Sequence, residues 1–259
     1  MLRFHLIGDW PAGSITCTPT ASTFDPTAEV QQLIDIAWAA RKRELGDHLY
    51  DGRLCRLESF HHAGSHLTLL LSETSYKSFL GTNYANPALA DRFGPAALAN
   101  ALGFSTAVLS SDDHIMLAVR SRTSAYHAGR IHTFGGTIEP GHSINVFDEA
   151  LRELSEEAGL NRSDIADIRC AALAEDASTR QPELVFLARS TLPRTQIEQQ
   201  INKQEHSAFW PLPVTRESLE SAVHHKPRLT PIAAAALLLW GRRLYGLPWF
   251  TEHSCRMTA

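Results

Sequence analysis

Three glutamates crowd one short stretch of the chain, Arg152–Leu160, which reads Arg-Glu-Leu-Ser-Glu-Glu-Ala-Gly-Leu. Glu153, Glu156 and Glu157 stand three and four residues apart, so on a helix they share one face, about 5–6 Å apart at Cβ. Like charges at this spacing repel each other, and a divalent cation would relieve that repulsion. Magnesium prefers oxygen ligands and usually keeps waters and substrate phosphate oxygens in its shell. The pattern is compatible with a magnesium site, although an acidic helix face is more often simply solvated.

Apolar residues predict a packed helix beneath these carboxylates. They recur at intervals of three and four and form one buried stripe: Phe147, Leu151, Leu154 and Ala158. Gly159 is typical of a helix C-terminus. Upstream, residues 134–141 read Phe-Gly-Gly-Thr-Ile-Glu-Pro-Gly, and glycines let a backbone turn tightly and approach a ligand closely. We therefore expect the loop and the helix to cradle a diphosphate together with its metal.

At these residues the sequence resembles the Nudix hydrolase family, whose box runs Gly-x5-Glu-x7-Arg-Glu-U-x-Glu-Glu-x-Gly-U, with U a bulky apolar residue. The second half of the box is matched without a gap from Arg152 to Leu160, and the first half is matched at Gly136. The sequence then departs twice, because His142 stands where the family has glutamate and two extra residues precede Arg152. Counting back from Arg152 instead places Ile144 at the glutamate position. We expect these departures to affect the rate more than the fold.

The resemblance implies both a fold and a set of roles. The implied fold class is α/β, a Nudix α/β/α sandwich with a mixed sheet, preceded here by a smaller N-terminal α+β region. Glu153 and Glu157 would hold Mg²⁺, or Mn²⁺ in its place, with Glu156 as a ligand or as support for one. The carbonyl of Gly136 would be a further metal ligand. Arg152 would orient Glu153 through an ion pair.

Further candidate residues lie outside the box. Many members of the family add a carboxylate from a later loop or strand, as a metal ligand or as the base. Glu183, which opens a predicted strand, is the preferred candidate and Glu175 the second; an ordinary strand-edge charge is an equal alternative for Glu183. Arg120 and Arg122 follow another predicted strand. They are either solvated, or one of them reaches a phosphate, which a planar guanidinium can contact bidentately.

A second resemblance covers residues 74–83, Thr-Ser-Tyr-Lys-Ser-Phe-Leu-Gly-Thr-Asn. This segment is similar to one in a eukaryotic Nudix branch, the UDP-glucose hydrolases, which share the plan of an N-terminal region, this segment and then a Nudix domain. The resemblance implies a UDP-sugar substrate, with Tyr76, Thr82 and Asn83 as substrate contacts. The alternative is that the segment only packs the two regions together. By its own pattern the segment is a short helix that ends at Gly81.

Composition narrows the class of protein. A hydrophobic content of 44% with 20% charged residues is typical of a soluble globular chain, and 259 residues suffice for a sizeable core. The net charge of -4 gives no signature of nucleic-acid binding. The four cysteines lie far apart without a CxxC pair, which argues against a zinc or disulfide framework and favours a cytoplasmic location. No apolar run approaches the roughly 20 residues that span a bilayer, and no signal peptide is evident. The oligomeric state cannot be read from the sequence.

The pattern divides the chain into an N-terminal region, 1–105, and a Nudix domain, 106–259. Helices are predicted at Glu29–Leu45, Ala88–Phe93, Ala96–Leu102, Arg194–Gln200, Thr215–Ala222 and Ile232–Tyr245. Strands are predicted at Phe4–Ile7, Leu54–Phe60, Leu67–Leu71, Ala107–Leu109, Ile115–Val119, Ile165–Leu173, Leu184–Ala188 and Phe209–Pro211.

The function that follows is magnesium-dependent hydrolysis of the pyrophosphate bond of a nucleoside diphosphate sugar. UDP-glucose or UDP-galactose would give UMP and a sugar 1-phosphate, and the substrate is the only partner expected. A phosphoanhydride repels an incoming hydroxide, whereas bound magnesium neutralises that charge and lowers the pKa of a coordinated water. A carboxylate, with Glu183 preferred, would accept the water proton. Two alternatives stay open: a Nudix hydrolase of another substrate, such as ADP-ribose or coenzyme A, and a non-catalytic module that binds a nucleotide.

Overall fold

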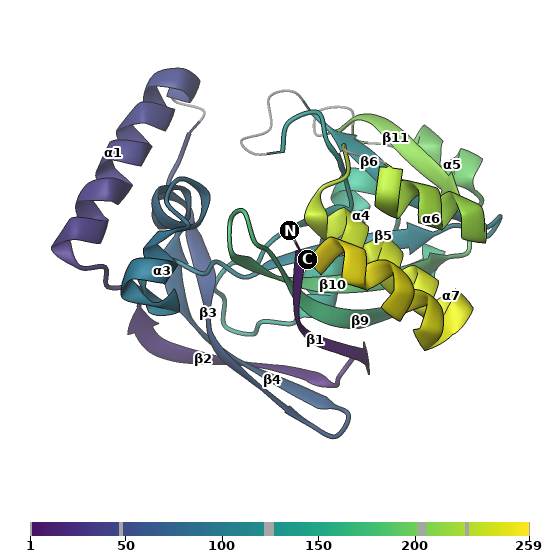
Figure 1. Ribbon diagram of the computed structural model, residues 1–259, viewed down its shortest axis with the longest axis horizontal. Coiled ribbons are helices and arrows are strands. Elements are labelled where there is room, and N and C mark those ends of the chain that lie inside the picture. The colour runs from purple at the N-terminus through teal and green to yellow at the C-terminus, as the bar shows by residue number, and fades with distance from the viewer. Residues whose placement is uncertain are drawn as a thin grey trace.

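The computed structural model describes residues 2–46, 49–121, 127–200, 202, 206–225 and 228–258. Within these residues a large sheet and a small sheet organise the molecule (Figure 1). The large sheet contains β1 (Leu2–Pro11), β5 (Gly103–Leu109), β6 (His114–Arg120), β7 (Ile131–His132), β8 (Phe134–Thr137), β9 (Ile165–Asp176), β10 (Gln181–Ser190) and β11 (His206–Pro213). The small sheet contains β2 (Ile15–Thr23), β3 (Arg53–Ala63) and β4 (His66–Ser75). The α-helices are α1 (Ala28–Leu45), α2 (Tyr76–Phe79), α3 (Leu89–Phe93), α4 (Val146–Ala158), α5 (Arg194–Gln199), α6 (Arg216–His225) and α7 (Pro231–Thr258).

The large sheet is mixed, as predicted. Its strands follow the order β1-β9-β10-β5-β6-β11, with β7 paired to β6 and β8 paired to β5. β10 and β5 run parallel, whereas the other neighbours are antiparallel. Side chains alternate between the faces of a strand. Accordingly, Leu184 and Phe186 of β10 pack with Phe147 of α4, while Val185 and Leu187 pack with α7. Helices thus cover both faces, which confirms the predicted α/β fold.

Helix α4 carries the acidic stretch and forms as its sequence predicts. The side chain of Asn145 accepts a hydrogen bond from the backbone N–H of Phe147 and caps the first turn. In the predicted stripe, Phe147 and Leu154 are buried, which anchors the helix to the large sheet. Gly159 ends the helix with a φ of 65°, in the left-handed conformation that glycine adopts most readily.

The N-terminal part of the chain contributes to both sheets. β1 pairs antiparallel with β9 and so belongs to the large sheet, whereas β2, β3 and β4 form the small one. Helices α1 and α3 lie beside the small sheet, away from α7 (Figure 1). The predicted boundary between residues 105 and 106 falls inside β5. The division into two domains stays a prediction.

Two helix predictions in this part of the chain were wrong. The helix expected to end at Gly81 continues as a π-helical turn, Leu80–Tyr84. Gly81 is needed there for close approach, because a Cβ at this position would lie 2.5 Å from the backbone Cα of Ile34 in α1. The helix expected at Ala96–Leu102 is only a 3₁₀ turn, Pro95–Ala97. The backbone beyond that turn bonds to β3 instead, where Leu102 donates its N–H to the carbonyl of Cys55.

The remaining predicted helices and strands are present, with their ends moved by a few residues. The last helix is the largest departure, because it continues beyond Tyr245 through a non-helical residue at Gly246 (φ 85°) and ends at Thr258. In the described parts of the chain, every helix is too short or too polar to cross a membrane.

Candidate active site

Arg152 lies at the centre of the acidic face of α4. Its guanidinium donates hydrogen bonds to Glu149 (3.1 Å), Glu153 (2.8 Å) and Glu156 (2.8 Å). Partial burial alone would lower the pKa of Arg152, but the hydrogen bonds to Glu156 and Glu149 and the charge of Glu153 raise it above its ordinary value. The predicted ion pair between Arg152 and Glu153 is therefore present, within a wider network.

Glu153 meets the glycine loop at the base of this network. A Cβ added to Gly136 would lie 2.9 Å from Oε1 of Glu153, so any larger residue would require this carboxylate to shift. Burial raises the pKa of Glu153 to about 7, the nearby charge of Glu157 adds to this effect, and Arg152 opposes it. Arg152 alone does not offset the cost of holding the half-buried Glu153 beside the buried Glu157. This is the kind of site that a divalent cation stabilises.

Glu157 is buried, with 5% of its surface exposed, and it faces the strands. Its Oε2 accepts a hydrogen bond from the backbone N–H of Gly135 over 3.1 Å. The Nε2 atom of His206, at the start of β11, lies 3.4 Å from the same oxygen. Glu156, in contrast, keeps about half of its side chain exposed and contacts Arg152. The structure thus holds Glu153 and Glu157 inside the site and leaves Glu156 at its rim.

The donor set suits magnesium, although the chain does not already form a complete cage. Among the described residues, no three His, Cys, Asp or Glu side chains converge as a metal-ligand group. Magnesium needs few protein ligands, because it keeps several waters and binds one or two carboxylates together with substrate phosphates. Glu153, Glu157 and the carbonyl of Gly136 are hard oxygen donors of this kind. The residues present therefore fit the ion.

A cavity of about 480 Å³ opens in front of Glu153. One wall comes from the large sheet and α4, with Thr137, Glu139, Arg152 and Glu153. The opposite wall comes from the N-terminal part of the chain, where Leu45, Leu49, Tyr50, Gly52, Leu54 and Tyr76 line it. The predicted substrate residue Tyr76 thus lies in one cavity with the predicted metal ligand Glu153.

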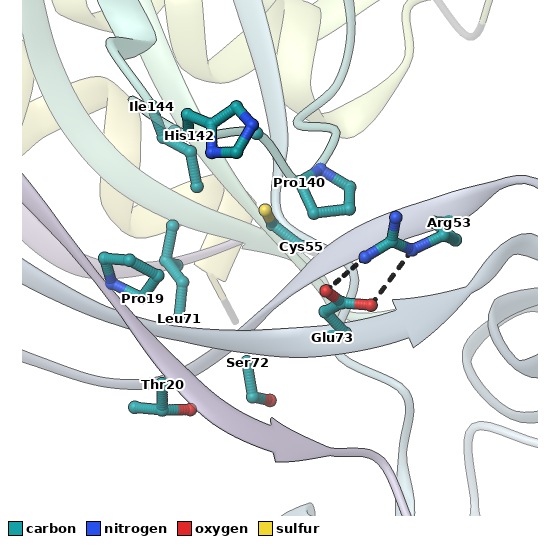
Figure 2. A pocket seen from close by; sticks show the side chains of 11 residues that line it. Pro19, Thr20, Arg53, Cys55, Leu71, Ser72, Glu73, Pro140, His142 and Ile144 are labelled. Carbon is teal, nitrogen blue, oxygen red and sulfur yellow. Dashed lines mark hydrogen bonds and ion pairs between the residues drawn. The ribbon is translucent and has the colours of Figure 1, made fainter.

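His142 lies in a different cavity, of about 380 Å³, between the small sheet and the loop that follows β8. Figure 2 shows its ring above Pro140 and Ile144, across from the ion pair of Arg53 with Glu73. The residue that replaces the family glutamate therefore does not line the cavity in front of Glu153. Its loop separates the two cavities, since Glu139 lines one and His142 the other.

Glu183 is not brought together with the carboxylates of α4. Strand alternation places it on the face of β10 that packs against α7, opposite α4. There its Oε2 accepts a hydrogen bond from Ser105 over 2.9 Å. Burial raises the pKa of Glu183 to about 7, and the charge of Asp176 adds to this, whereas Ser105 and Arg120 lower it. Glu153 responds to different neighbours, so the two carboxyl groups occupy separate environments.

Glu175, the second candidate, is buried and held by the first strand. It accepts hydrogen bonds from His5 (3.0 Å) and Arg3 (3.4 Å) of β1. These contacts hold the first strand against β9. Both carboxylates that were candidates for the extra ligand or base are thus engaged by the sheet.

Thr82 and Asn83 are fully buried and engaged by the protein itself. The Thr82 hydroxyl donates to the carbonyl of Ser78 and accepts the N–H of Ala99. The Asn83 amide donates to the carbonyls of residues 179 and 180, in the turn between β9 and β10, and its oxygen accepts the N–H of Asn100. Their positions favour the alternative interpretation, in which the segment packs two regions together, and give no support to the prediction that they contact substrate.

The structure describes only one of the two arginines predicted to follow β6, and that residue, Arg120, is the last of the strand. Arg120 is half-buried, and its charge acts on Tyr76, whose pKa is raised mainly by burial. The contact of Arg120 with a substrate phosphate stays a prediction. Arg122 lies outside the described residues.

Sequence reasoning missed three residues of the site. Glu139 belongs to the glycine loop of residues 134–141, so its place in that loop was a signal that could have identified it. Tyr50 and His206 carry no such signal, because they lie about 100 residues before and about 50 residues after α4. Only the folded chain brings them to Glu153 and Glu157.

Comparison with known proteins identifies the family. The model of the NUDIX domain matches residues 100–231, whereas no curated protein matches the sequence. Similar solved structures include a mutT/nudix family protein from Listeria innocua (15% identity, 56% of this chain and 94% of that chain covered, TM-score 0.40) and an Ap4A hydrolase from C. elegans (14%, 57% and 99%, TM-score 0.38). Another is the NUDIX domain of Shewanella oneidensis NrtR, solved with ADP ribose (17%, 62% and 98%, TM-score 0.38). With about half of its length matched by the family model, the chain belongs to the NUDIX domain family and is a pyrophosphohydrolase acting on nucleoside diphosphate derivatives.

Proposed function

We propose that the protein hydrolyses the pyrophosphate bond of a nucleoside diphosphate sugar, with UDP-glucose or UDP-galactose as substrate and magnesium as cofactor. One observation carries the proposal: the wall of a single cavity holds both Glu153 of α4 and Tyr76 of the segment that resembles the UDP-glucose hydrolases. A cavity of about 480 Å³ is within the range typical of small-molecule sites.

The two walls of the cavity have different proposed roles, and the wall formed by α4 and the large sheet would hold the metal. Arg152 holds the carboxylate of Glu153 in place through the 2.8 Å hydrogen bond, and Gly136 leaves room for it. When bound at Glu153, Glu157 and the carbonyl of Gly136, magnesium would neutralise the diphosphate and acidify a coordinated water. Glu139, the other carboxylate on the cavity wall, is our candidate for the base that would accept the water proton.

The N-terminal wall is proposed to recognise the organic part of the substrate. Tyr50 exposes 73% of its surface, which is a large exposure for an aromatic residue beside a cavity. Aromatic rings offer a flat apolar surface on which a nucleobase can stack and a hydroxyl that can bond to a sugar. Tyr76 and Tyr50 therefore supply a platform opposite the carboxylates. We assign no part in proton transfer to Glu183, because it lies on the other face of the sheet.

A substrate panel with magnesium tests the proposal. Purified protein is incubated with UDP-glucose, UDP-galactose, ADP-ribose and coenzyme A, and products are separated by chromatography. We expect UMP and sugar 1-phosphate, with kcat/KM for a UDP-sugar at least tenfold above the other two compounds. ADP-ribose or coenzyme A turned over ahead of the UDP-sugars contradicts the substrate choice. A protein that binds UDP-sugar and leaves every diphosphate intact is a binding module instead.

A further inference from the structure

His206 is a buried histidine whose position no part of the proposed function uses. It exposes 4% of its surface and packs its ring edge-on against Phe134, with ring centroids 5.7 Å apart. Neither ring nitrogen has a well-aligned hydrogen-bond partner within the described part of the chain. The Oε2 atom of the Glu157 carboxylate lies 3.4 Å from Nε2 of His206. A buried polar ring without an aligned partner is unusual, and here it faces a metal-ligand candidate.

The backbone next to His206 also holds Glu157. The N–H of Asn202 donates to the main-chain carbonyl of Glu157 over 3.0 Å, and the N–H of His206 donates to the carbonyl of Asn202 over 3.1 Å. These bonds tie the start of β11 to the last turn of α4, whose carbonyls lack partners inside the helix. His206 and Glu157 are therefore fixed relative to each other by backbone contacts.

One oxygen of the carboxylate has both a strand N–H and the histidine ring beside it. Oε2 of Glu157 accepts the backbone N–H of Gly135 and faces the imidazole of His206. No hydrogen bond among the described residues reaches the other oxygen, Oε1. Groups around a ligating carboxylate commonly fix its orientation in this way, and their loss typically weakens metal binding by about 10–100-fold.

We propose that His206 is a positioning residue for the metal site. Its imidazole, with Nε2 3.4 Å from Oε2 of Glu157, keeps that oxygen against the strands, so that Oε1 would be left to bind the cation. The inference rests on the function proposed above and deepens it, since it assigns the support of a metal ligand to a residue 49 positions further along the chain.

Metal binding tests the inference more directly than activity does. Mn²⁺ affinity is measured by electron paramagnetic resonance titration of the full chain, free of substrate. His206→Phe keeps a ring against Phe134 but removes both nitrogens, and His206→Gln keeps an N–H donor near the position of Nε2. We expect His206→Phe to weaken Mn²⁺ binding at least tenfold and His206→Gln to stay within about threefold of the wild type. The KM for the nucleotide at saturating metal should be unchanged in both variants.

Circular dichroism and the unfolding temperature show whether each variant is folded. If His206→Phe does not fold, His206→Asn replaces it in the test. The Asn amide is too short to reach Oε2 of Glu157, so this variant should also bind Mn²⁺ more weakly. A folded His206→Phe protein with wild-type Mn²⁺ affinity overturns the inference. Equal loss of Mn²⁺ affinity in the Phe and Gln variants also overturns it, because this result indicates that His206 acts only through packing. A wild-type protein that binds no Mn²⁺ defeats the proposed function itself, so the two failures are distinguishable.

Discussion

Replacing Glu183 by glutamine should stabilise the protein above neutral pH. The carboxyl group is buried beside Ser105, and burial raises its pKa from 4.5 to about 7. The folded protein therefore keeps a proton that the unfolded chain releases near pH 4.5. This favours the folded state fully at low pH, and the benefit is lost as the pH rises from about 4.5 to about 7. A shift of this size corresponds to about 3 kcal/mol of stability lost above that range.

Glutamine cannot ionise, yet its side-chain oxygen can still accept the hydrogen bond of Ser105. We expect Glu183→Gln to have a higher free energy of unfolding than the wild type at pH 8, by about 2–3 kcal/mol, and a similar one at pH 4.5. Chemical denaturation at the two pH values measures both. Glu252→Gln, at an exposed position of α7, is the matched control and should change little at either pH.

The same variant separates structure from catalysis. Because Glu183 lies opposite α4, its kcat should stay within about twofold of the wild type, whereas loss of a general base typically costs about 10²–10⁴-fold. A stability difference that is equal at both pH values refutes the reasoning about burial. A large fall in kcat refutes the assignment of Glu183 to the sheet rather than to the reaction.

Three further substitutions test other parts of the account. His142→Glu should keep a rate within about tenfold of the wild type, because His142 lines the other cavity; loss of activity to background contradicts this placement. Tyr76→Ala should raise the KM for the nucleotide sugar several-fold, and Tyr76→Phe should change it less, as steady-state kinetics can show. An unchanged KM in both variants would mean that Tyr76 does not contact the substrate. Asn83→Ala should lower the free energy of unfolding by about 2–3 kcal/mol, since it leaves buried backbone groups unpaired. The kcat/KM of the folded fraction should be unchanged. A denaturation curve that matches that of the wild type would contradict the predicted loss of stability.

The acidic helix could be predicted from the sequence because every signal for it is local. One segment of the chain, residues 134–159, contains all of these signals. They are the spaced carboxylates, the apolar stripe, Gly159 and the glycine loop that meets Glu153. The ion pair between Arg152 and Glu153 follows from adjacency on that helix. For the same reason, most strands and helices were found within a few residues of their ends.

The failures concern contacts between distant segments. Glu183 could be placed on a strand, but its face depends on which helices cover the sheet, and strand periodicity alone cannot say this. Gly81 reads as a helix stop, whereas its role is to admit Ile34 of α1, more than 40 residues earlier. His206 carries no motif, and only the pairing of β11 brings it to Glu157.

Glu157→Gln tests the central claim most directly. The amide can still accept the N–H of Gly135, so we expect a fold close to that of the wild type, but it cannot offer an anionic ligand. Magnesium-dependent turnover of UDP-glucose should fall at least a thousandfold, about 4 kcal/mol in the barrier, and Mn²⁺ binding should be lost with it. A folded Glu157→Gln protein with wild-type turnover and wild-type Mn²⁺ affinity would show that the metal binds elsewhere.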